Sequence, residues 1–141
     1  MKTLLIVVIT SLIFLAPTSK KKITFLTSDS LEVTADLYLV NEEYPYLILF
    51  HQEGSSRGEY NETAQKFSKL NFNCLAVDLR SGESSNYIRN ETTRKARETG
   101  KPSRFIDALS DIDASIEYAH NLNNQDVILI SEFVASCQLD E

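Results

Sequence analysis

The sequence predicts an α/β fold in which an antiparallel hairpin leads into a mostly parallel sheet flanked by helices. Residues 22–27 and 31–39 alternate apolar with polar side chains across a short polar turn, which is typical of a hairpin with one solvated face. Residues 46–50, 72–77 and 126–130 are almost continuously apolar, as expected for strands covered on both faces. Helical patterns separate these strands, and this alternation favours an open parallel sheet.

The first predicted helix spans residues 59–70, and Asn71 can end it. Its apolar positions are Tyr60, Ala64, Phe67 and Leu70. The second begins near Ser110, which with Asp113 resembles a capping box, and it stops in the polar residues 121–124. Its apolar face comprises Leu109, Ile112, Ile116 and Ala119. Between the helices, the polar residues 78–102 form a connection long enough to have a function or short structure of its own.

Length and composition limit the classes of protein that need to be considered. A chain of 141 residues suits one domain, and a hydrophobic content of 43% is sufficient for a packed core. The formal net charge of −6 argues against a nucleic-acid-binding surface, which needs a clustered basic face.

Residues 1–19 have the pattern of a signal peptide or N-terminal anchor. A short basic start precedes an apolar run over residues 3–16, and Pro17 follows it. The run is too short to span a bilayer comfortably, so no stable membrane span is predicted beyond a possible N-terminal anchor. We therefore expect export to the periplasm or the extracellular space, with an uncleaved anchor and a buried core helix as the alternatives.

The cysteines and the clustered aspartates do not predict a disulfide or a metal site. Cys74 lies within a predicted strand and resembles a small buried hydrophobe, so we expect Cys74 and Cys137 to be unpaired. Three acidic residues near the second helix suggest a metal cluster, but Asp113 is off the face that Asp107 and Asp111 share, and acids near a helix start favour its dipole. Neither a metal nor a cofactor is predicted.

Ligands of open α/β sheets bind beyond the carboxyl ends of the strands, so three segments are candidates for a site: residues 50–60, residues 78–82 and the tail from Ser131. In the first, a histidine and a glycine follow a buried strand, which suits a loop that turns backbone N–H groups toward an oxyanion. Its Arg57 is expected to pair in solvent with Glu53 or Glu59 rather than to bind a substrate carboxylate. In the second segment, Asp78 and Arg80 are expected to form a pair that stabilises the loop.

Four segments together resemble one protein family. They are His51-Gln52-x-Gly54-Ser55-Ser56-Arg57-Gly58-Glu59-Tyr60, Asp78-Leu79-Arg80-Ser81-Gly82, Asn90-Glu91-Thr92-x-x-Lys95-Ala96 and Asp107-Ala108-Leu109-x-Asp111-Ile112. In this order they resemble the N-terminal portion of dienelactone-hydrolase-like serine hydrolases of the α/β-hydrolase superfamily. The resemblance implies small-molecule ester or acyl substrates and no metal. It also implies that His51 and Gln52 occupy the oxyanion loop. The Gln52 N–H is the better candidate donor, and the His51 imidazole more simply bonds to backbone and shapes the turn.

The sequence departs from this family where the nucleophile is expected. The G-x-S-x-G turn should follow residues 126–130, but the nucleophile position holds Phe133 and the first glycine position holds Ser131. The acid and base should come later in the chain, whereas His51 and His120 both precede this point.

We therefore expect three segments: residues 1–19, a partial hydrolase domain over residues 20–130 that lacks its C-terminal strands, and a divergent tail over residues 131–141. The functional prediction is a truncated or degenerate exported hydrolase that is inactive as it stands. The alternative is a non-catalytic binding domain that retains the pocket loops. A nucleotide-binding domain is more distant, because Gly54 and Gly58 do not form the G-x-G-x-x-G phosphate turn.

Overall fold

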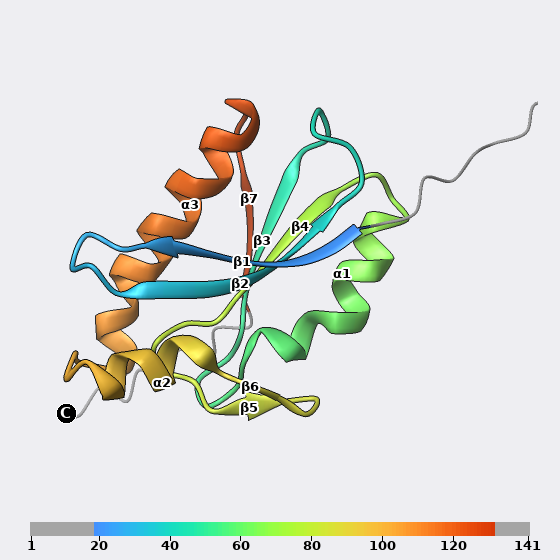
Figure 1. Ribbon diagram of the computed structural model, residues 1–141. Helices are drawn as coiled ribbons and strands as arrows, with labels where there is room; N and C mark the ends of the chain where they lie inside the picture. Colours follow the sequence, from blue (N-terminus) through green and yellow to red (C-terminus); the bar gives the residue numbers. More distant parts are fainter. Residues whose placement is uncertain (1–18, 132–141) are drawn as a thin grey trace, which may run out of the picture.

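The computed structural model describes residues 19–131, which form a five-stranded mixed sheet with helices on both faces (Figure 1). Across the sheet, the strands are β1 (Ser19–Leu26), β2 (Glu32–Leu39), β4 (Asn73–Val77), β3 (Tyr46–Phe50) and β7 (Ile128–Ser131). The β1/β2 and β2/β4 pairs are antiparallel, and the β4/β3 and β3/β7 pairs are parallel. The predicted α/β class is confirmed, but the pairing is mixed rather than mostly parallel.

The helices occupy the connections between these strands. A 3-10 turn, η1 (Arg57–Tyr60), leads into α1 (Asn61–Ser68), and a second one, η2 (Phe105–Ala108), leads into α3 (Leu109–Asn123). The long polar connection contains a small antiparallel ribbon of β5 (Ser84–Ser85) and β6 (Ile88–Arg89), followed by α2 (Glu91–Glu98). The expectation that this connection has structure of its own is therefore confirmed.

The hairpin prediction is confirmed for β1, but β2 has no solvated face. Along β2 the apolar residues Val33, Ala35 and Leu37 face the α3 side of the sheet and belong to one apolar cluster. The alternate side chains, Thr34 and Asp36, are also buried, with exposed fractions of 0% and 3%. Because β2 lies inside the sheet and α2 and η1 cover its second face, its polar side chains are enclosed rather than solvated.

Two apolar layers, one on each face of the sheet, form the core. The layer on the α3 side includes Ile48, Phe50 and Leu75, and that on the α1 side includes Leu47 and Leu49. Successive residues of β3 thus alternate between the two layers, as expected for a strand buried on both faces. Cys74 is buried on the α1 side, as predicted, and burial raises the pKa of its thiol to about 12.

The helix predictions are correct in position and wrong in detail. The first helix ends at Ser68, and Leu70, one of its predicted apolar positions, is 65% exposed because the chain has already left the helix. Asn71 terminates this region as predicted, with a left-handed φ of 65°. Leu109 is 58% exposed, because the buried side of α3 carries Asp111, Ser115 and Ala119.

The start of α3 also differs from the prediction. The Asp107 carboxylate accepts hydrogen bonds from the backbone N–H of Arg104 and from its guanidinium at the start of η2, so Ser110 is not a cap. Its hydroxyl instead accepts a hydrogen bond from Arg80 Nη2 at 2.8 Å. The predicted polar stop is confirmed at Asn124, whose φ of 54° ends the helix.

The strand predicted over residues 126–130 is present as β7, but it is not buried. It lies at the edge of the sheet, and Ile128 and Leu129 are 47% and 48% exposed. No helix within residues 19–131 is long and apolar enough to cross a membrane. The predicted export segment apart from Ser19, and the tail positions Phe133 and Cys137, lie outside the described residues.

Candidate functional site

The three predicted loops begin at the C-terminal ends of neighbouring parallel strands, as expected from the topology of the sheet. Phe50, at the end of β3, pairs with Val77 at the end of β4 and with Ser131 at the end of β7. The segments that follow these strands therefore start side by side.

His51 is buried between the first two loops and bonds to the backbone of both. Its Nε2 accepts a hydrogen bond from the Leu79 N–H at 2.9 Å, and its Nδ1 lies 2.8 Å from the Gln52 carbonyl oxygen. Because Leu79 can only donate, Nε2 is the acceptor and the proton belongs on Nδ1. Burial lowers the pKa of His51, which favours this neutral form. His51 therefore bonds to the backbone, as the sequence-based interpretation expected.

The Gln52 carbonyl is held by a second donor, the Ser55 N–H, at 3.1 Å. This bond closes a four-residue turn whose third residue, Gly54, has a φ of +79°. A positive φ at that position is the signature of a type II turn and explains the need for glycine. Since the peptide is planar and trans, the Glu53 N–H points away from the Gln52 carbonyl and hence away from His51. Within residues 19–131, neither the Gln52 nor the Glu53 N–H donates a hydrogen bond.

The second loop approaches the first so closely that only glycine fits at position 82. A Cβ there would lie 2.2 Å from the Ser55 carbonyl oxygen and 2.7 Å from His51 Cε1. The Asn90 side chain reaches the same place, donating to the Leu79 carbonyl at 2.8 Å. Together these contacts hold the His51 ring between the two loops.

Arg57 is buried in an ionic network instead of pairing in solvent, so the prediction for it was wrong. Its side chain contacts Asp78 through Nη1, Glu91 through Nη2 at 2.8 Å, and Asp36 through Nε at 3.2 Å. The Arg57 N–H also donates to Asp78 Oδ1 at 2.7 Å. Burial raises the pKa of Asp78, and the charge of Arg57 opposes that shift. The network anchors the start of η1 to β2, to the end of β4 and to α2.

Arg80 does not pair with Asp78, contrary to the prediction. It bonds to Asp111 of α3 at 2.7 Å and to Asp29 of the hairpin turn at 2.9 Å, and thereby connects both elements to the end of β4. The bond from Arg80 holds the pKa of Asp29 well below its usual range. The three clustered aspartates have separate environments, since Asp107 pairs with Arg104 and Asp113 is exposed. In the described part of the chain, no three acidic, histidine or cysteine side chains could hold a metal ion.

Sequence reasoning missed two features near these loops. Both carboxylate oxygens of Glu59 and the hydroxyl of Ser81 are buried, and within residues 19–131 they have no hydrogen-bond partner.

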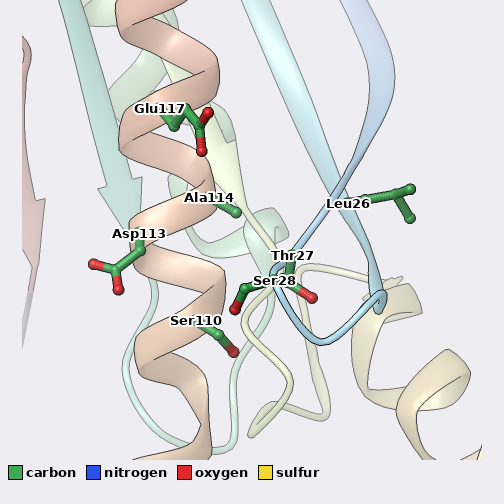
Figure 2. A pocket seen from close by; sticks show the side chains of 7 residues that line it. All are labelled: Leu26, Thr27, Ser28, Ser110, Asp113, Ala114 and Glu117. Atoms are coloured by element: carbon green, nitrogen blue, oxygen red, sulfur yellow. The ribbon is translucent and has the colours of Figure 1, made fainter.

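A cavity of about 320 Å³ lies between the hairpin turn and α3, as Figure 2 shows, and no residue of the three loops lines it. Its lining residues are Leu26, Thr27, Ser28, Ser110, Asp113, Ala114 and Glu117. The polar turn was visible in the sequence, whereas its position against α3 was not.

His120 is remote from the loops. It lies in the last turn of α3, where its Nδ1 is 3.0 Å from the Gln125 carbonyl oxygen. The same turn is anchored near the start of β3, because Asn123 donates to the Tyr44 carbonyl at 3.2 Å. His120 is therefore at the opposite end of the sheet from His51.

These observations define a mixed α/β protein in which buried His51 and Arg57 hold the first two loops together, while Arg80 connects the second loop to α3 and to the hairpin turn. Neither the comparison with protein-family models nor the comparison with curated proteins gave a match.

Proposed function

We propose that this chain is a serine-hydrolase-like α/β protein, similar to dienelactone hydrolases, which binds ester or acyl groups through its first loop and does not hydrolyse them. The observation that carries the proposal is the arrangement of His51 and the Gln52 turn. The imidazole holds the Gln52 carbonyl at 2.8 Å, and this orients the next N–H, that of Glu53, away from the histidine.

Backbone donors held in this way suit a carbonyl oxygen or a carboxylate. A rigid N–H group that is already oriented loses little freedom when it binds an oxygen with negative charge, and bonds of this kind are stronger than neutral ones. The family resemblance suggested the Gln52 N–H as the donor. The turn geometry adds the Glu53 N–H, which we propose as a second donor to the same ligand oxygen.

The same geometry supports binding without turnover. A general base needs a ring nitrogen that can accept a proton from a nucleophile. The Nε2 of His51 already accepts a hydrogen bond from Leu79, and His51 is 1% exposed. His120 lies at the opposite end of the sheet from the loops. Phe133, at the position expected for the nucleophile, has no nucleophilic atom.

Export through residues 1–19 is part of the proposal, and fractionation of cells that express the chain would test it.

Titration of the labelled protein with butyrate, followed by amide NMR, tests the binding site. We expect saturable shifts of the Gln52 and Glu53 amides. Glu53→Pro removes one donor at a position where a type II turn favours proline, so binding should weaken by about tenfold or more. Glu53→Ala keeps the N–H and should bind like the unmodified chain. Equal binding by both variants would exclude the Glu53 donor, and absence of any shift at this loop would refute the binding proposal.

The claim of no turnover has its own test. We expect no hydrolysis of p-nitrophenyl acetate above the rate of a denatured control. Hydrolysis that Ser131→Ala or Ser136→Ala abolishes would show that a serine nucleophile is present and that the claim is wrong.

A further inference from the structure

The cavity between the hairpin turn and α3 has two walls. One wall is the end of β1 with the turn that follows it, and the other is one face of α3 (Figure 2). The α3 residues that line it are Ser110, Asp113, Ala114 and Glu117, whose spacing is that of a single helix face. A volume of about 320 Å³ is sufficient for a small organic ligand.

Arg80 is not part of the lining, but it holds both walls in place. Its guanidinium donates to Asp29 in the hairpin turn at 2.9 Å, and to Ser110 and Asp111 on α3 at 2.8 Å and 2.7 Å. The Arg80 side chain is 3% exposed, so these bonds are shielded from water. The fold itself therefore sets the position of one wall against the other.

The lining of the cavity carries negative charge without a counter-charge. Asp113 and Glu117 lie one turn apart on α3, and within residues 19–131 neither carboxylate forms an ion pair or a hydrogen bond. None of the lining residues is basic, and the charge of Arg80 is already balanced by two other aspartates. The cavity therefore favours a cation.

The other lining residues favour an organic cation over a metal ion. Ca²⁺ takes six to eight oxygen ligands, and in the described part of the chain no three acidic, histidine or cysteine side chains could hold a metal ion. An ammonium group needs only three acceptors, and carboxylate and hydroxyl oxygens such as that of Ser28 can supply them. Leu26 and Ala114 add apolar carbon atoms that an alkyl chain can contact.

We propose that this cavity binds a short linear diamine, with one ammonium group at Asp113 and the other at Glu117. Residues one turn apart on a helix have Cβ atoms about 5–6 Å apart, a separation that an extended four-carbon diamine spans. Both side chains are exposed and unpaired within residues 19–131, so each can turn toward the ligand. This inference does not depend on the proposed ester or acyl binding.

Titration of the labelled full chain with 1,4-diaminobutane, followed by amide NMR, tests the site. We expect saturable shifts at Ser28 and over residues 110–117. The double variant Asp113→Asn, Glu117→Gln should weaken binding by about tenfold or more, because it removes both charged acceptors.

The matched control removes the same charge outside the cavity. Glu42→Gln, Glu43→Gln changes two exposed carboxylates near the opposite end of α3, where the Glu42 carbonyl accepts a hydrogen bond from Asn123 at 3.5 Å. This variant should bind the diamine like the unmodified chain. Unchanged amide shifts in β3 and β4 would show that both double variants are folded.

Three results would overturn the proposal. The first is the absence of saturable shifts at the cavity, and the second is an equal loss of affinity in the two double variants, which would indicate a general effect of charge. The third is displacement of the diamine by an equal concentration of Ca²⁺, which would indicate a metal site. Butylammonium has one charge and should bind several-fold more weakly, and equal affinity for it would exclude binding at two carboxylates.

Discussion

Replacing Arg57 should reveal how much the buried ionic network contributes to stability. Arg57 contacts three carboxylates, and its side chain is 7% exposed, while those of Asp36 and Asp78 are 5% and 0% exposed. Arg57→Met keeps most of the apolar stem and removes the charge. Asp78 is then left buried without its counter-charge, although the backbone N–H of residue 57 still bonds to it. Asp36 keeps its ion pair with Lys20 at 2.9 Å.

The expected cost follows from this burial. Breaking a buried pair by removing one partner costs about 3–5 kcal/mol, because the remaining charge is uncompensated. The matched control is Arg94→Met, which breaks a pair with Glu98 on α2 at 2.7 Å in which both side chains are more than half exposed. Exposed helix pairs of this spacing contribute about 0.3–0.5 kcal/mol.

Urea unfolding followed by circular dichroism measures both variants. We expect a large fall in the unfolding midpoint for Arg57→Met and almost none for Arg94→Met, with similar slopes for the two. If the two variants lost the same stability, or if Arg57→Met lost less than about 1 kcal/mol, the buried network would contribute no more to stability than an exposed ion pair.

Two further predictions concern single buried groups. The pKa of His51 is lowered by burial, so the unfolded chain binds its proton more readily. The free energy of unfolding should therefore have its full value above about pH 6.5 and decrease below that pH by at most about 1.4 kcal/mol per pH unit. Urea unfolding midpoints measured over this pH range should show the decrease in the unmodified chain and not in His51→Gln. The pKa of Cys74 is raised to about 12, so in a Cys137→Ser background its thiol should not react with a disulfide reagent at pH 8 until the chain is unfolded. Rapid reaction of the native protein would show that β4 is more accessible than its burial implies.

The sequence was sufficient to predict the five strands of the main sheet and the helices α1 and α3 in their order, but not β5, β6 or α2. Alternation over residues 22–39 and the continuously apolar strands are local patterns, and the hairpin and β3 follow them closely. The position of His51 directly after a buried strand was sufficient to place it at the carboxyl edge.

Partners of charged residues could not be predicted in the same way. Arg57 has acidic neighbours at positions 53 and 59, and local reasoning paired it with them, but the structure pairs it with Asp78 and two other distant carboxylates. An ion pair depends on which side chains the fold brings together, and sequence separation contains little of that information.

What the sequence alone determined is the type of the apolar segments, namely the strands of the main sheet and the helices α1 and α3, because the periodicity of apolar residues depends on neighbours along the chain. The tertiary structure decided which faces are covered. It enclosed β2 on both sides, although its alternation predicted a solvated face, and it left β7 at an edge, although its apolar run predicted burial. The physical reason is that burial depends on what packs against a segment. Within residues 19–131, β2 lies between two neighbouring strands, β1 and β4, whereas β7 has a single neighbouring strand, β3.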